Sequence, residues 1–159
     1  YKPAGSRGQA LHQDQRYLHV EPGTCVAAWL ALDRCDEENG CLQVVPGSHR
    51  IGVLCPVKSD GARSFTAETV DVPEGMSVVD VVMEPGDVLF FHGNLVHGSE
   101  PNRSADRFRR IIVGHYAVAE AERISRWYPD ALRFDGTSAS LDLVDAGGKC
   151  GEWRNGEFH

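Results

Sequence analysis

Residues 84–99 read EPGDVLFFHGNLVHGS, in which turn-forming and apolar segments alternate. Pro85 and Gly86 predict a tight turn, and the run Val88–His92 that follows has the length and composition of a β-strand. A Gly-Asn pair then separates this run from a second apolar segment at residues 95–99. This part of the chain is therefore expected to form short strands joined by turns.

The same pattern continues on both sides of this stretch. Apolar segments at residues 25–32 and 41–45 flank a polar, Gly-containing turn at 36–40, and this arrangement predicts a β-hairpin. A polar loop is expected at residues 58–66, where it could carry specificity. Further strands are expected at residues 68–72, 78–83 and 109–118. Because strands and helices do not alternate, a mainly β sandwich or jelly-roll barrel is favoured over a doubly wound sheet.

The length of 159 residues suits a single domain. We expect the β-barrel core that carries the function within residues 1–118 and a tail of the same domain at residues 119–159. Helical composition is confined to residues 119–127, and Pro129 ends it, so the tail is expected to hold one short helix followed by loops. The chain begins at Tyr1 with no element ahead of the first candidate site residue. We therefore expect a fragment that lacks its N-terminal part.

Charge and composition restrict the partners and the compartment. The net charge of −7 and the pI of about 5.4 argue against nucleic acid, because nucleic-acid binders carry basic surfaces. No apolar run has the length of a membrane span, and the first residues lack the apolar stretch of a signal peptide. A small-molecule partner is expected, and the oligomeric state is left open. Five cysteines without a CxxC pair predict reduced thiols and a cytoplasmic location: Cys25, Cys35, Cys41, Cys55 and Cys150.

A candidate metal site is formed by His12-Gln13-Asp14 and His97. In an extended strand alternate residues share a face, so His12 and Asp14 would point the same way. With His97 as a third ligand, two imidazoles and one carboxylate would hold one face of an octahedral ion, as in non-haem Fe(II) oxygenases. Alone, one His-x-Asp is a weak signal in a chain with 7 histidines and 23 acidic residues. The competing interpretation is a pair of surface polar residues on a half-exposed strand.

A basic cluster, Arg107, Arg109 and Arg110, follows His97 closely. In a strand at residues 109–118, Arg109 and Arg110 point to opposite faces, so one arginine faces the interior. A buried guanidinium needs a partner, and the carboxyl group of a dicarboxylate can receive its two-pronged contact. The alternative is an arginine whose stem lies on the barrel while its charge reaches solvent.

Two further residues are candidates for lining the same cavity. Ser99 shares the face of His97, so its hydroxyl could bond a bound carboxylate, or it could instead be a turn residue that bonds its own backbone. Trp29 lies between Ala27 and Ala31 on one face, which suits either a cavity wall or core packing. Four other histidines are expected to be hydrogen-bonded packing residues: His19, His49, His92 and His115. Of these, His115 could also face the cavity.

Taken together, these segments resemble the phytanoyl-CoA dioxygenase family of Fe(II)/2-oxoglutarate-dependent oxygenases, over roughly residues 2–116. The matching motifs are Lys2-Pro3, Leu11-His12-Gln13-Asp14, Trp29-Leu30-Ala31-Leu32-Asp33, Asn39-Gly40-Cys41-Leu42, Val45-Pro46-Gly47-Ser48-His49, the segment 86–92 and His97-Gly98-Ser99. The resemblance implies a double-stranded β-helix, a cupin-like jelly-roll barrel with few helices. It also implies Fe(II) as cofactor, with 2-oxoglutarate and O2 as co-substrates.

The resemblance also implies roles for single residues. His12, Asp14 and His97 would hold iron. Arg109 would pair with the C5 carboxylate of 2-oxoglutarate, and the co-substrate pocket would be lined by Ser99 and Trp29. The stretch from Asn102 to Arg109 is one residue longer than the usual spacing in the family, so Arg107 competes for the anchor role. Arg109 is preferred because it stands seven residues before Tyr116.

The activity implied is hydroxylation of an unactivated C–H bond in a small organic molecule, with release of succinate and CO2. Asp14 favours hydroxylation over halogenation, because halogenating relatives have a small residue at the carboxylate position. The alternatives are another outcome of the same oxidant, a cupin-like metal-dependent isomerase or small-molecule-binding domain, and an iron-binding relative without turnover. The sequence does not identify the primary substrate.

Overall fold

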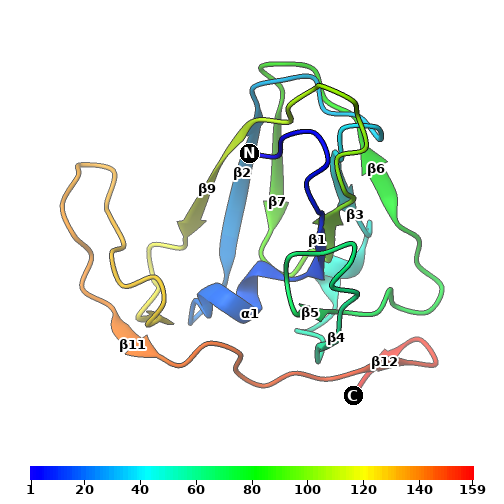
Figure 1. Ribbon diagram of the computed structural model, residues 1–159. Coiled ribbons are helices and arrows are strands. Elements are labelled where there is room, and N and C mark those ends of the chain that lie inside the picture. Colours follow the sequence, from blue (N-terminus) through cyan, green and yellow to red (C-terminus); the bar gives the residue numbers. More distant parts are fainter.

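Two antiparallel sheets form the body of the molecule in the computed structural model, which describes residues 1–159 (Figure 1). One sheet has the order β1 (Gln9–His12), β8 (His97–Ser99), β3 (Leu42–Val44) and β6 (Val79–Val81). The other has the order β7 (Val88–His92), β2 (Cys25–Ala31) and β9 (Ile111–Ala117). Neighbours in each sheet come from distant parts of the chain, because the chain passes repeatedly between the two layers. The mainly β, jelly-roll architecture predicted from the strand pattern is confirmed.

Short elements surround these sheets. A single α-helix, α1 (Asp14–Leu18), follows β1, and a 3-10 turn, η1 (Ser48–Arg50), follows β3. Three two-stranded sheets are formed by β4 (Val57–Lys58) with β5 (Glu68–Thr69), by β10 (Arg123–Ser125) with β11 (Asp142–Val144), and by β12 (Trp153–Arg154) with β13 (Glu157–Phe158). None of the helices has the length and hydropathy that a membrane crossing requires.

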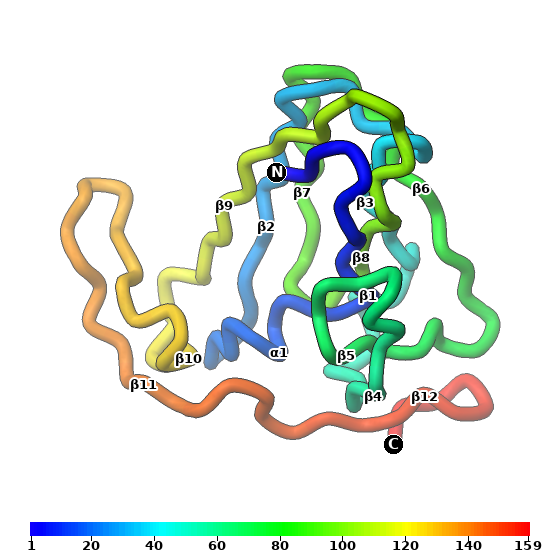
Figure 2. The backbone as a smooth tube through the Cα atoms, viewed as in Figure 1, coloured from blue at the N-terminus to red at the C-terminus, as the bar shows by residue number.

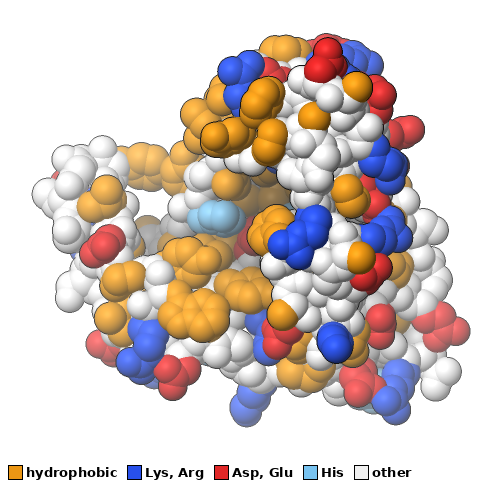
Figure 3. Space-filling view, in the orientation of Figure 1, with side chains coloured by type: hydrophobic (Ala, Val, Ile, Leu, Met, Phe, Trp, Pro, Cys, Tyr) orange, Lys and Arg blue, Asp and Glu red, His pale blue; other side chains and the backbone are white.

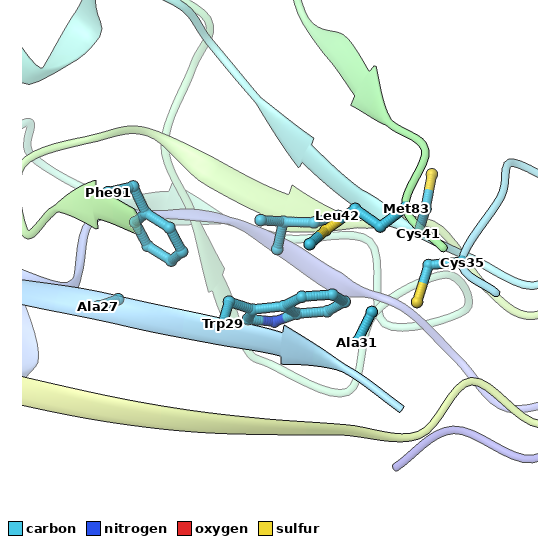
Figure 4. Close-up of a cluster of buried hydrophobic side chains, with 8 residues drawn as sticks. All are labelled: Ala27, Trp29, Ala31, Cys35, Cys41, Leu42, Met83 and Phe91. Carbon is cyan, nitrogen blue, oxygen red and sulfur yellow. The ribbon is translucent and has the colours of Figure 1, made fainter. Parts of the chain in front are cut away.

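The core between the two main sheets is small, and its aromatic rings are those of Trp29 and Phe91. Along β2 the side chains of Cys25, Ala27, Trp29 and Ala31 are buried, whereas Val26 is exposed, as strand alternation requires. Figure 4 shows Trp29 pointing from β2 toward Leu42 of the opposite sheet, with alanines on either side of it along the strand. These small neighbours leave room for the indole between the layers.

The hairpin expected between residues 25–32 and 41–45 does not form. The polar turn is present, since the amide of Cys41 donates to the carbonyl of Asp36 at 2.9 Å. However, β2 pairs with β7 and β9, whereas β3 pairs with β8 and β6. Trp29 and Leu42 face the same interior from opposite layers, so the connection crosses between sheets. Local turn chemistry predicted the turn correctly but not the strand partners.

The helix expected at residues 119–127 is also absent. This segment turns and then forms β10, which pairs in parallel with β11. Ile124 is buried there and packs against Leu18, Val20 and Cys25. Helical composition was therefore outweighed by tertiary packing and strand pairing. The division into a core at residues 1–118 and a tail at 119–159 stays a prediction.

The cysteine prediction needs one correction. Cys55 and Cys150 form a disulfide across 95 residues of sequence, whereas Cys25, Cys35 and Cys41 are buried free thiols. The backbone supports this link, because the amide of Cys55 donates to the carbonyl of Gly151 at 2.8 Å. The pair joins the tail to the segment after η1, and Figure 2 shows the tail running back past β4 and β5 to reach it. Local sequence patterns could not predict a pairing between cysteines so far apart in the chain.

Candidate active site

The three candidate metal ligands lie at adjoining ends of β1, α1 and β8. His12 is the last residue of β1 and stands opposite His97, the first residue of β8, with ring centroids 4.2 Å apart. The Oδ1 atom of Asp14 lies 3.6 Å from Nε2 of each histidine. All three residues are buried, and their ligand atoms lie within 4.8 Å of one another. Two nitrogens and one oxygen thus converge on one point.

The backbone route to this arrangement differs from the continuous strand expected at His12 and Asp14. Strand β1 ends at His12, and α1 begins at Asp14. Gln13 between them keeps an extended backbone, with φ −125° and ψ 128°, so the two ligands still point to the same side. Gly98 lets β1 and β8 approach, because an added Cβ would lie 2.8 Å from the carbonyl oxygen of Gln9. A larger residue there would separate the two histidines.

The segment between the ligands is anchored by one buried amide. The side chain of Gln13 donates from Nε2 to the carbonyl oxygens of Asn94 at 2.8 Å and Gly52 at 3.1 Å. Its Oε1 accepts from the amide of Leu54 at 2.8 Å. Gln13 is only 1% exposed, so loss of these bonds would leave buried polar groups without partners. The positions of His12 and Asp14 are therefore set by two other segments, around residues 52–54 and at Asn94.

Both imidazoles are oriented for metal binding. Nδ1 of His12 lies 2.9 Å from the carbonyl oxygen of Ala10, and Nδ1 of His97 lies 2.9 Å from that of Leu95. A proton on each Nδ1 leaves the Nε2 lone pairs directed toward Asp14. Burial, and then the nearby His97, lowers the pKa of His12 to about 4, so its ring is neutral near pH 7. This donor set fits a divalent iron ion held through one face.

Asp14 is held in its ionised form. Burial alone would raise the pKa of its carboxyl group, but the hydrogen bond from His115 and the neighbouring imidazoles outweigh that effect and lower the pKa. Nε2 of His115 lies 3.1 Å from Oδ2 of Asp14. His115 was expected to be a packing residue, and its hydrogen bond to the proposed metal ligand Asp14 cannot be predicted from the local sequence. The only signal for it was its position on the inward face of β9, six residues after Arg109.

Two buried cationic side chains, Arg109 and Lys2, lie in the same cavity as the metal ligands. Arg109 is 9% exposed and makes one side-chain hydrogen bond, from Nε to the carbonyl oxygen of Gly40 at 3.2 Å. Its guanidinium carbon lies 5.4 Å from the ring centroid of Trp29. Lys2 donates from Nζ to Oγ of Ser99 at 2.9 Å. Burial, and then the charge of Arg109, lowers the pKa of Lys2 to about 7. Neither cation forms a salt bridge. Nζ of Lys2 also donates to the carbonyl oxygens of Gly40 and Glu100, whereas Arg109 keeps N–H groups that are free to bind an anion.

Lys2 was not among the single residues predicted for the site. Its only signal was membership of the Lys2-Pro3 motif, which has no periodicity to mark it as inward-facing. Ser99 behaves as a cavity residue rather than as a turn residue bonding its own backbone, since its hydroxyl accepts from Lys2. Trp29 is both a core residue and part of the cavity wall, the two roles considered for it from the sequence.

The other two arginines lie outside this region. Arg107 pairs with Asp36 at 2.8 Å and with Glu38 at 2.6 Å. Arg110 pairs with Asp33 at 2.6 Å. Each therefore has acidic partners on the surface of the protein, whereas Arg109 does not. Of the three arginines, only Arg109 lines the cavity.

One cavity of about 990 Å³ joins the metal ligands to the two cations. Its walls include Phe91, Leu42 and Val113, and Phe65 and Thr66 come from the polar loop predicted at residues 58–66. Figure 3 shows a hollow on this face of the molecule, with a histidine inside it and hydrophobic side chains around its rim. The volume lies at the upper end of the range for ligand-binding clefts, so it has room for a co-substrate and a second molecule.

The family model described as phytanoyl-CoA dioxygenase matches residues 1–111, more than half of the chain. The chain belongs to the phytanoyl-CoA dioxygenase family. The peroxisomal phytanoyl-CoA dioxygenase of Bos taurus is 39% identical over 119 residues, covering 72% of this chain and 35% of that protein. The chain thus spans about a third of the length of that curated relative. The family match agrees with the presence of a His-Asp-His cluster and buried cations in one cavity.

Two solved structures of similar fold carry informative titles. EvdO2 from Micromonospora carbonacea var. aurantiaca, complexed with 2-oxoglutarate, is 26% identical with a TM-score of 0.58, covering 76% of this chain and 51% of its own. SnoN, a non-haem alpha ketoglutarate dependent epimerase from nogalamycin biosynthesis, is 27% identical with a TM-score of 0.61, covering 97% of this chain and 55% of its own. The similar structures therefore include one whose title names epimerisation.

Proposed function

We propose that this protein is an Fe(II)- and 2-oxoglutarate-dependent dioxygenase that hydroxylates an unactivated C–H bond of a small organic molecule, releasing succinate and CO2. The observation that carries the proposal is the joining of two features in one cavity. One is the buried group of His12, Asp14 and His97, and the other is the unpaired cation pair of Lys2 and Arg109. A cofactor-independent binding domain has no need for both.

Each side chain has a defined task in this proposal. His12, Asp14 and His97 hold iron through one face and leave the opposite positions open. Arg109, assisted by Lys2 and the hydroxyl of Ser99, binds the far carboxylate of 2-oxoglutarate and so fixes its orientation. When bound, iron together with 2-oxoglutarate and O2 supplies an oxidant strong enough to attack an unactivated C–H bond.

The walls of the cavity are expected to protect this chemistry from water. Trp29 packs beside the guanidinium of Arg109, and Phe91 lies 4.6 Å from the ring of His97, measured between centroids. Both rings are buried. An apolar wall on each side of the charged groups strengthens their attraction for an anion and limits unproductive oxidation.

A second candidate outcome is epimerisation, which the likeness to SnoN favours. Hydroxylation and epimerisation begin with the same hydrogen removal and differ in what is returned to the carbon. Product analysis by mass spectrometry separates them, because hydroxylation adds one oxygen atom whereas epimerisation leaves the mass unchanged. A cupin-like isomerase would release no CO2 from 2-oxoglutarate.

The decisive experiment is anaerobic titration of the protein with Fe(II) and 2-oxoglutarate. A visible metal-to-ligand charge-transfer band is expected for the wild type and for Arg110→Lys, whose side chain lies outside the cavity. The band should be absent from Asp14→Ala. Absence of the band in the wild type at saturating iron would sink the proposal. Release of CO2 from 2-oxoglutarate after O2 is admitted would then report turnover.

Partners and compartment also belong to the proposal. A small-molecule substrate and no nucleic acid are retained, with the oligomeric state open, whereas the cytoplasmic location expected from the cysteines is the part most in need of a test. The Cys55–Cys150 disulfide argues against the cytoplasm, because disulfides are rare in reducing compartments. Thiol trapping in cells, combined with imaging of the tagged protein, tests this part. An oxidised pair in a protein found outside the cytosol would overturn the assignment.

A further inference from the structure

His115 lines the cavity but belongs neither to the hydrophobic core nor to the three proposed metal ligands. It lies on β9 with Val113 on the inward face, and its partner across the sheet is Ala27 of β2. Ala27 is fully buried and small, so the imidazole has room to extend across the strand pair. His115, whose side chain is 28% exposed, thus reaches the metal end of the cavity from the sheet opposite β1 and β8.

The two oxygens of Asp14 have different neighbours. Oδ2 lies 3.1 Å from Nε2 of His115. Oδ1 lies 3.6 Å from Nε2 of both His12 and His97. Because an ionised carboxylate can only accept, the bond to Oδ2 requires a proton on Nε2 of His115. One oxygen is therefore engaged by a donor while the other faces the two metal-binding nitrogens.

The same geometry separates His115 from the metal ligands. The group whose ligand atoms converge within 4.8 Å contains His12, Asp14 and His97 but not His115. A histidine that coordinates a metal uses a lone pair, whereas Nε2 of His115 is directed at Asp14 with its proton. His115 therefore acts on the site through Asp14.

We propose that His115 is a positioning residue that fixes Asp14 as a ligand through Oδ1 alone. This inference rests on the proposed function, since it concerns the same iron site. With Oδ2 held by a hydrogen bond, the carboxylate cannot turn to offer both oxygens to the ion, so a coordination position stays open for a co-substrate. Hydrogen-bonded groups behind metal ligands typically change metal affinity by about 10–100-fold when removed.

The test compares two substitutions of His115 by metal titration. His115→Leu removes the donor but keeps an apolar side chain, and we expect it to weaken Co(II) binding by about 10–100-fold. His115→Gln keeps an N–H donor near the position of Nε2, and we expect affinity within about threefold of the wild type. Co(II) is used because its absorption spectrum reports coordination without turnover. The leucine variant should also show a changed Co(II) spectrum, reflecting a second carboxylate oxygen at the metal.

His92→Leu is the matched control. His92 lies on β7 of the same sheet but does not line the cavity, and its ring is 6.1 Å from that of His49. Its loss should leave Co(II) affinity unchanged. Circular dichroism and thermal unfolding of each variant without metal separate a folding defect from a changed site.

Two outcomes overturn the inference. If His115→Leu binds Co(II) with wild-type affinity and spectrum, the hydrogen bond does not position Asp14. If the glutamine variant loses as much affinity as the leucine variant while both remain folded, His115 acts as a direct ligand. Failure of the proposed function is separate, because it would appear as a missing 2-oxoglutarate band in the wild type even where Co(II) binding follows the expected order.

Discussion

Lys2 and Arg109 are joined by a pair of backbone hydrogen bonds, from the amide of Lys2 to the carbonyl of Arg109 at 3.0 Å and from the amide of Arg109 to the carbonyl of Lys2 at 2.9 Å. This bridge brings the N-terminal residues against the start of β9. It also places two positive charges together in a buried region, which is unfavourable unless an anion binds there. The arrangement explains why the pKa of Lys2 falls to about 7.

The guanidinium of Arg109 should be needed for 2-oxoglutarate binding. Arg109→Lys keeps the charge but loses the planar two-pronged contact, and we expect a cost of about 2–4 kcal/mol, or about thirtyfold to several hundredfold in affinity. Iron binding should survive. Arg107→Lys is the control, because Arg107 is already paired with Asp36 and Glu38. A loss of affinity in the Arg107 variant alone would transfer the anchor role to that residue. Titration of the charge-transfer band measures both.

The affinity for 2-oxoglutarate should depend on pH through Lys2. Its folded pKa of about 7 lies below the ordinary value of 10.5, so the unfolded chain binds more protons between these values. The contribution of Lys2 to folding stability therefore rises with pH across this window. An anion prefers the protonated amine, so affinity should be highest below about pH 7 and fall by at most about tenfold per pH unit above it.

Lys2→Met provides the comparison for this pH dependence. The variant should bind 2-oxoglutarate more weakly at low pH and lose the decline attributable to Lys2. Isothermal titration calorimetry from about pH 6 to about pH 9 measures both profiles. Parallel declines in the two proteins would show that another group is responsible.

Removing any one of the metal ligands should abolish iron binding with little effect on folding. His12, Asp14 and His97 lie at the edge of the cavity rather than within the apolar cluster around Trp29. We therefore expect His12→Ala, Asp14→Ala and His97→Ala to lose turnover but keep the wild-type circular dichroism spectrum. Iron content of the purified proteins checks the assignment. If two of the three retained wild-type iron and turnover, the ligand set would be wrong.

The Cys55–Cys150 disulfide should stabilise the fold. It closes a loop of 95 residues, and a chain-entropy model predicts a loss of about 3–5 kcal/mol in the free energy of unfolding when it is removed. Urea unfolding of Cys55→Ser measures this effect. A dithiol reductant should destabilise the wild type to the same extent and have no further effect on the variant. Equal stability of wild type and variant without reductant would show that the bond does not form.

The sequence by itself determined the local features of this protein. Turn residues and apolar runs predicted β7 at residues 88–92 and located β9 within residues 109–118, because strand formation there follows from short-range periodicity. The same parity argument put one of two adjacent arginines inside. Motif content also identified the family, which the match over residues 1–111 confirms.

Only the tertiary structure decided which distant segments meet. It assigned β2 and β3 to opposite sheets, turned residues 123–125 into a strand, and paired Cys55 with Cys150. It also brought Lys2 to Ser99 and His115 to Asp14, contacts that span 97 and 101 residues of sequence. Such contacts depend on packing between layers and on burial of charge, and neither quantity is encoded in the spacing of neighbouring residues.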